Sequence, residues 1–159
     1  MKKYLILLLL SFVVVGVNGQ TKKRTTKRKA TVTQRARTPE QMVIGKHMLS
    51  LQWISWDYYG TCNITKQPDG TLRCKGEQLS RENDDYLRID GEISIVDAKH
   101  LVFTGTIATK IYHINNGQEC LREGTFDFES TQNRKYWRLQ QMENPCDMCA
   151  DYVDIYFKR

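Results

Sequence analysis

The sequence lacks the motifs by which common enzyme classes are recognised. It contains no glycine-rich phosphate loop, no nucleophile elbow and no His-Glu-x-x-His pair. Its three histidines, His47, His100 and His113, have no spacing that would supply a zinc site. It also shows no amphipathic helix pattern and no internal repeat. These absences favour a non-enzymatic, all-β protein that needs no metal and no other cofactor.

Long apolar runs are also missing, except for one close to the N-terminus. Lys2 and Lys3 precede an apolar run from Tyr4 to Val15, and Val17-Asn18-Gly19 follows it. A positive start, a short apolar run and small residues at the end are typical of a secretory signal peptide. We therefore expect residues 1–19 to be a signal peptide and the mature protein to be exported, to the periplasm or outside the cell.

Acidic residues are absent from residues 20–38, which carry eight Lys and Arg and almost nothing apolar. Such a segment cannot bury enough surface to offset the entropy of ordering, so we expect a disordered basic linker. It could contact an anionic envelope surface or act as a solvated spacer. The remaining residues, 39–159, have 14 Lys and Arg against 18 Asp and Glu, a net charge of −4. This acidic balance argues against a nucleic-acid-binding fold.

Residues 39–159 show the period-two alternation of β-strands, most clearly in a three-stranded meander from Leu101 to Met142. Asn116-Gly117 predicts a two-residue hairpin loop, which would place Ile107 opposite Phe126. Gln132-Asn133 predicts the next turn, which would place Trp137 opposite Phe128. Both turns assign the same inner face to the middle strand.

About eight short antiparallel strands fit into this single β domain. The pattern predicts an all-β, up-and-down meander that forms a closed or nearly closed barrel, or a two-sheet sandwich. Inward glycines at Gly91 and Gly105 favour the barrel, because they let a sheet coil sharply. The architecture resembles calycin-type barrels, although Gly45-Lys46-His47 lacks the tryptophan that lipocalins carry before the first strand.

Five cysteines in an exported chain indicate disulfides. A hairpin centred on Pro68 would place Cys62 across from Cys74, and the meander register brings Cys120 close to Cys146. These two pairs leave Cys149 as a free thiol. Cys146 and Cys149 also form a C-x-x-C motif, but no helix pattern follows it, which argues against thioredoxin-like redox chemistry.

Arg122 falls on the inner face of its predicted strand, with Glu143 across from it and His113 inward near Cys120. One interpretation is an ion pair at the rim of the core, because buried charges are usually paired. The other is an anion-binding arginine at a cavity mouth. A hydrolase-type site that uses Arg122, His113 and Glu143 is a further alternative, and it requires these three side chains to converge.

Four tyrosines fall on outward positions of their strands: Tyr112, Tyr136, Tyr152 and Tyr156. Outward tyrosines suit contacts with a protein or glycan, and they also stabilise exposed sheet faces by cross-strand pairing. The sequence thus predicts an exported binding domain for a small apolar ligand inside the barrel, or for a surface protein or glycan outside it. The alternative is a cell-envelope structural module held at an anionic surface by its basic linker.

Overall fold

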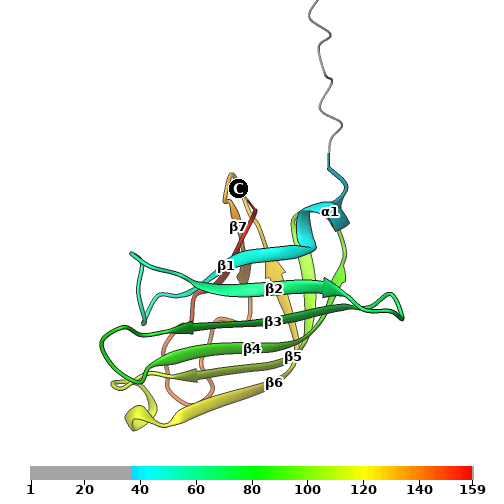
Figure 1. Ribbon diagram of the computed structural model, residues 1–159. Helices are drawn as coiled ribbons and strands as arrows, with labels where there is room; N and C mark the ends of the chain where they lie inside the picture. The colour runs from blue at the N-terminus through cyan, green and yellow to red at the C-terminus, as the bar shows by residue number, and fades with distance from the viewer. Residues whose placement is uncertain (1–36, 159) are drawn as a thin grey trace, which may run out of the picture. The chain divides into compact units, whose positions relative to one another are not determined.

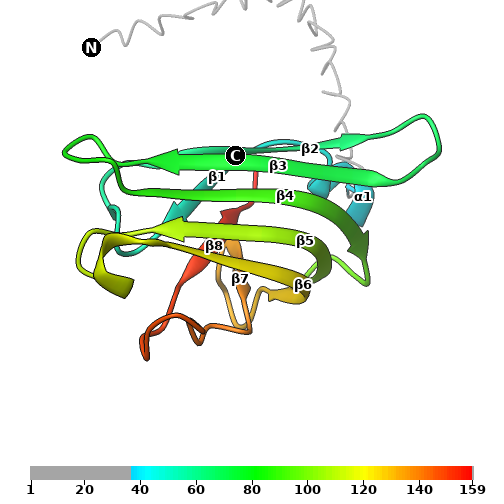
Figure 2. The same ribbon diagram turned by 90° about the horizontal axis from the view of Figure 1, so that it is seen from below.

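The computed structural model describes residues 37–158, which form a closed barrel of eight antiparallel strands in sequence order (Figures 1 and 2). The strands are β1 (Gly45–Leu51), β2 (Gly60–Lys66), β3 (Leu72–Leu79), β4 (Tyr86–Ile95), β5 (His100–Lys110), β6 (Glu119–Glu129), β7 (Tyr136–Leu139) and β8 (Val153–Tyr156). The predicted up-and-down closed barrel is confirmed. The predicted signal peptide and residues 20–36 of the predicted linker lie outside the described residues. Among residues 37–158, no helix has the length and apolar character needed to cross a membrane.

A short helix, α1 (Pro39–Val43), precedes β1 and is absent from the sequence prediction. Thr38 begins it with a capping box, in which its hydroxyl accepts from the Gln41 N–H and the Gln41 side chain accepts from the Thr38 N–H. Val43 is fully buried, and the buried His47 ring lies 2.6 Å from the Val43 carbonyl and 2.8 Å from that of Tyr156. A helix of five residues is too short for helical periodicity to be visible in the sequence.

Aromatic side chains occupy the barrel interior. Phe103, Phe128 and Trp137 are at most 1% exposed, and the Phe103 ring lies 6.1 Å from that of Phe128. The neighbouring strand and the Phe103 ring leave no room beside Gly91, where an added Cβ would overlap the Thr104 carbonyl oxygen and lie 2.8 Å from Phe103 Cε2. A side chain at Gly91 would therefore clash with the backbone of β5, which explains why the strand carries glycine at an inward position.

The β5–β6 connection differs from the predicted two-residue hairpin. Ile107 pairs with Arg122 instead of Phe126, a shift of four residues. The cause is a longer loop over residues 111–118, in which Ile111 and Ile114 turn into the core. The 3-10 turn η1 (Asn115–Gly117) ends this loop, and its two asparagines adopt positive φ. Because the shift is even, the inner face of each strand is unchanged.

The other two predicted registers are each wrong by two residues. Phe128 pairs with Leu139 instead of Trp137, because residues 130–135 form a loop closed by a bond from the Ser130 hydroxyl to the Arg134 carbonyl. Cys74 pairs with Ile64 instead of Cys62, because the turn at residues 67–71 is longer than a tight hairpin. Both shifts are even, so the cysteines and the core residues still point inward.

Candidate functional site

Arg122 lies inside the barrel end, and its carboxylate partner is Asp151 rather than the predicted Glu143. An Arg122 guanidinium nitrogen lies 3.7 Å from Asp151 Oδ2, and both side chains are at most 5% exposed. The guanidinium also donates to the Gln141 carbonyl. Asp151 accepts from Trp53 Nε1 at 3.1 Å and from the Asn144 amide at 3.0 Å. These contacts make a closed polar cluster that holds the 140–152 loop against the barrel.

Burial dominates the electrostatics of this pair. Burial raises the pKa of the Asp151 carboxyl, against the lowering effects of Trp53, Arg122 and Asn144. Burial likewise lowers the pKa of the Arg122 guanidinium, and Asp151 only partly offsets it. Both shifts favour the neutral forms, so the pair is costly to bury and serves to neutralise two charges rather than to add stability.

The structure does not bring Arg122, His113 and Glu143 together. Glu143 is exposed and forms a backbone bridge with Ala150. His113 follows the end of β5 and is exposed instead of inward, since the 111–118 loop breaks the alternation on which the prediction rested. Its ring packs against Trp53 and Tyr112. Residues 37–158 also hold no group of three His, Cys, Asp or Glu side chains placed to bind a metal ion.

Four of the five cysteines lie in two close pairs. The sulfur atoms of Cys120 and Cys146 are 2.00 Å apart, at disulfide distance, and they tie the 140–152 loop to β6. Those of Cys62 and Cys74 are 2.9 Å apart, and both side chains are fully buried. Cys149 is a partly buried thiol, and burial raises its pKa. A partly buried thiol with a raised pKa makes a poor nucleophile.

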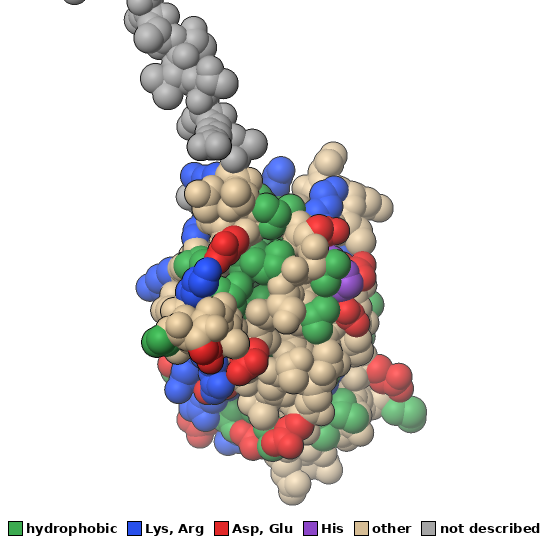
Figure 3. Space-filling model, turned by 90° about the vertical axis from the view of Figure 1, so that its right-hand side faces the viewer, with side chains coloured by type: hydrophobic (Ala, Val, Ile, Leu, Met, Phe, Trp, Pro, Cys, Tyr) green, Lys and Arg blue, Asp and Glu red, His purple; other side chains and the backbone are tan. Residues whose placement is uncertain are grey.

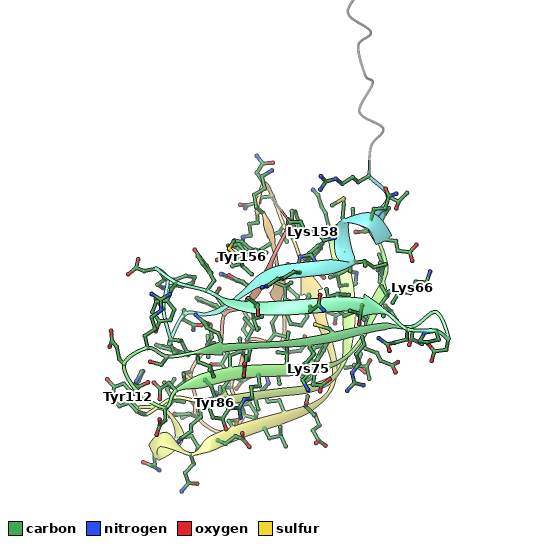
Figure 4. The ribbon with its side chains drawn as sticks, in the orientation of Figure 1. Lys66, Lys75, Tyr86, Tyr112, Tyr156 and Lys158 are labelled. Atoms are coloured by element: carbon green, nitrogen blue, oxygen red, sulfur yellow. A yellow bond between two sulfur atoms is a disulfide. The ribbon has the colours of Figure 1, made fainter. Side chains whose placement is uncertain are left out.

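Three of the four predicted tyrosines meet on the outside of the barrel, where β7 and β8 pair. Tyr136 and Tyr156 lie 5.2 Å apart between ring centroids, and Tyr59 joins them at 5.0 Å from Tyr156. Tyr152 lies over the Arg138 guanidinium at 4.4 Å. We call Tyr59, Tyr136, Tyr152 and Tyr156, with Arg138 and Asp154, the tyrosine face. Tyr112 lies apart from it, 68% exposed beside the β5–β6 loop (Figure 4).

A bidentate ion pair forms the centre of the tyrosine face. Arg138 donates to both carboxylate oxygens of Asp154 at 2.7 Å, and Asp154 is fully buried although it points outward. Burial raises the pKa of the Asp154 carboxyl. The hydrogen bonds from Arg138 to Asp154 raise the pKa of the Arg138 guanidinium. Asp154 reads in the sequence as an ordinary exposed acid between Val153 and Ile155. The Asp154 side chain becomes buried only because β8 pairs with both β1 and β7. The spacing of residues in the sequence therefore gives no signal for this ion pair.

A basic groove runs beside the tyrosine face. Two adjoining depressions of about 460 and 270 Å³ share Met48, Phe157 and Lys158. Their other lining residues are Lys46, His47, Tyr59, Thr61, Lys135 and Tyr156. The three lysines face no acid among the lining residues, although residues 39–159 as a whole are acidic. Figure 4 places Tyr156 and Lys158 on the same side of the barrel.

A third surface feature lies at the α1 end of the barrel (Figure 3). It is an open apolar hollow of about 700 Å³, lined by Pro39, Leu72, Ile93, Ile95 and Val96 among others. Glu40 stands at its margin, paired with Lys66 at 2.8 Å. It has no buried polar group comparable to the Arg138–Asp154 pair.

The fold and its surfaces define the chain as a small up-and-down β-barrel with an aromatic interior, whose polar clusters and tyrosines lie on the outside and at one end. Residues 21–157 match the model of the PM1083 family, so the chain belongs to this family. It is similar to the uncharacterized protein PM1083 of Pasteurella multocida (strain Pm70), with 48% identity over 126 residues. This match covers 76% of the chain and 80% of that protein. No solved structure matches the chain.

Proposed function

We propose that the protein is an exported, non-enzymatic binding domain that contacts a surface protein or glycan through its tyrosine face. The observation that carries this proposal is the gathering of four tyrosines around the bidentate Arg138–Asp154 pair, whose carboxylate is fully buried, on the outside of the barrel. A buried charge pair fixes the Arg138 side chain, and the guanidinium in turn holds the Tyr136 and Tyr152 rings. Rigid aromatic side chains lose little entropy on binding, so such a surface is suited to contacts.

The occupied interior supports an outer site over an inner one. Phe103, Phe128 and Trp137 take up the space in which a small apolar ligand would bind. Arg122, the predicted polar anchor of such a ligand, is engaged by Asp151 and Gln141. The binding function therefore belongs to side chains that point away from the core.

The composition of the outer surface also supports the proposal. Tyrosine, methionine and arginine are enriched in the cores of protein interfaces, and charged residues are more common at their rims. The groove beside the tyrosine face combines both kinds of residue, with Tyr59, Met48 and Tyr156 lining it together with Lys46 and Lys135. Export is supported by the Cys120–Cys146 pair at disulfide distance.

A photo-crosslinking experiment tests the proposal. Benzoylphenylalanine replaces Tyr59, which is 39% exposed, in the full chain expressed in the cells that produce it. The matched control carries the same residue at Val96, which is 59% exposed at the α1 end. We expect a discrete crosslinked adduct from position 59 and none from position 96. The partner identified in this adduct, once purified, should bind the wild-type protein about tenfold more tightly than the Tyr156→Ala variant.

Two results would overturn this proposal. One is the absence of any adduct at position 59, or the same adducts from positions 59 and 96. The other is a small molecule that native mass spectrometry finds bound stoichiometrically and that the Tyr156→Ala substitution does not release. The second result would move the site into the barrel interior.

A further inference from the structure

The barrel is closed by very little pairing between β6 and β7. Only Phe128 and Glu129 of β6 pair with β7, through Leu139 and Arg138. The other side of β6 is paired along its whole length with β5. Within residues 37–158, therefore, no strand pairs with the outer edge of β6 from Glu119 to Phe126. The 140–152 loop that follows β7 is tied to the start of β6 by the Cys120–Cys146 bond and adds no strand to this edge.

Backbone hydrogen-bonding groups point out of this edge. The Asp127 carbonyl accepts from the Gln140 N–H, and the Asp127 N–H donates to the Gln141 side chain, both away from β5. In an antiparallel pair, alternate residues turn their N–H and C=O groups to the same side. The N–H and C=O groups of Leu121, Glu123 and Thr125 therefore point to the same side of β6 as those of Asp127, away from β5.

Most residues along this part of the edge are exposed, with Gly124 among them. Gly124 has a φ of +148°, and an added Cβ would meet nothing closer than Phe126 Cζ at 4.0 Å. Leu121 is 52% exposed, and Glu123, Gly124 and Thr125 are also exposed. An accessible edge of this kind is a template for the addition of another strand.

The exposed charges of β6 before Thr125 and of the loop joined to it are of one sign. Glu119 and Glu123 are exposed on β6, and Glu143 and Asp147 are exposed on the 140–152 loop, which the Cys120–Cys146 bond joins to β6. Residues 139–157 contain no Lys or Arg, and the guanidinium of Arg122 is buried. Lys110 lies opposite Glu119 on β5, but Glu123 faces Thr106 and forms no ion pair within residues 37–158.

We propose that the free edge of β6 binds an extended, basic segment of a partner protein by β-strand addition. The partner's backbone would pair with Leu121, Glu123 and Thr125, and its Lys or Arg side chains would lie beside Glu123 and Glu143. A second copy is a poor occupant, because it would bring the same acids to the same edge.

A synthetic peptide, Lys-Thr-Lys-Val-Lys-Val-Lys-Thr-Lys, tests the proposal with the full mature chain. We expect saturable binding by calorimetry, and slower amide hydrogen exchange at Leu121, Glu123 and Thr125 by NMR. Glu123→Lys should weaken binding about tenfold or more by reversing the charge beside the added strand. The matched control is Glu92→Lys, the same charge change at an exposed outward position of β4, which should leave binding unchanged.

The same peptide with alternate backbone amides methylated separates strand addition from simple charge attraction. It keeps every lysine but cannot form the backbone ladder, so it should not bind or protect the three amides. Equal binding of the methylated peptide, or no binding of the original one, would overturn the proposal. Protection of the three amides without peptide, together with dimerisation, would assign the edge to a second copy and also overturn it.

Discussion

At the residue scale, the most consequential departure from expectation is the Arg122–Asp151 pair. The two side chains are buried at the barrel end, but the nearest guanidinium nitrogen of Arg122 lies 3.7 Å from Asp151 Oδ2. This distance is too long for a hydrogen bond, so the nitrogen has no hydrogen-bond partner in residues 37–158. Asp151 has better contacts, from the Trp53 indole and the Asn144 amide. Burial outweighs the attraction between the two charges and favours the neutral form of each group.

The raised pKa of Asp151 predicts a defined dependence of stability on pH. Burial raises this pKa above its unfolded value, so the folded protein binds a proton at a higher pH than the unfolded chain. The contribution of Asp151 to the free energy of unfolding is therefore greatest below the unfolded pKa, and it is lost as pH rises through the folded pKa. Urea unfolding of wild type and Asp151→Asn between pH 3.5 and about 7 measures this difference.

We expect the free energy of unfolding of wild type, minus that of Asp151→Asn, to fall as the pH rises through this window. Asp69 and Asp127 have lowered pKa values and titrate in both proteins, so the subtraction removes them. A difference that grows with pH would show that Arg122 and the hydrogen bonds outweigh burial.

At the scale of elements, the faces of the strands could be predicted from the sequence and their registers could not. Period-two alternation identifies Phe103, Phe128 and Trp137 as inward, whichever residue each one pairs with on the neighbouring strand. All three are buried. Register depends on loop length, and three loops are longer than the turn residues within them indicate. Ile111 and Ile114 illustrate the reason, since tertiary packing into the core draws them out of the predicted hairpin.

For the candidate sites too, the direction of a side chain could be predicted from the sequence, but its neighbours could not. Tyr136, Tyr152 and Tyr156 could be placed outward from their parity, but Tyr59 and Asp154 join them only through closure of the barrel between β1 and β8. The partner of Arg122 could not be found, because the predicted register between β6 and β7 was continued as far as Glu143. β7 instead ends at Leu139, and the loop after it brings Asp151 to the guanidinium.

In the observed register of β2 and β3, Cys62 and Cys74 are diagonal neighbours on the same face of the sheet. We propose that they form a disulfide. Their sulfur atoms are 2.9 Å apart. The contact with Cys62 and burial raise the pKa of Cys74, so this thiol reacts poorly in the folded protein. Both side chains are also fully buried. The bond should form during folding, with two electrons and two protons passing to a disulfide oxidant such as oxidised glutathione.

Alkylation under denaturing conditions, followed by mass spectrometry, counts the thiols. Protein isolated from an oxidising compartment should carry one free thiol, Cys149, and Cys62→Ser should carry two. Folded, reduced protein treated with oxidised glutathione should react far more slowly at Cys62 and Cys74 than the unfolded chain. Three free thiols in the oxidised wild type would contradict the proposed bond.

At the scale of the whole molecule, the charge is divided sharply along the chain. Residues 20–38 carry eight basic residues and no acid, whereas residues 39–159 carry a net charge of −4. The acidic barrel would be repelled by an anionic envelope surface, so any attraction must come from the basic residues. We propose that they hold the barrel at such a surface, as the alternative role of the protein requires.

Deleting residues 20–36 tests this role and leaves the Thr38 cap of α1 in place. The deletion should release the protein from the cell surface, because the remaining chain lacks the charge that attracts it. The wild type should be released by raised salt, since attraction between exposed charges is screened within about 10 Å at 0.1 M salt. A shuffled segment of the same composition should keep the protein at the surface. Retention of the deleted form would instead place the attachment on the barrel, where the tyrosine face and the β6 edge are the surfaces to examine.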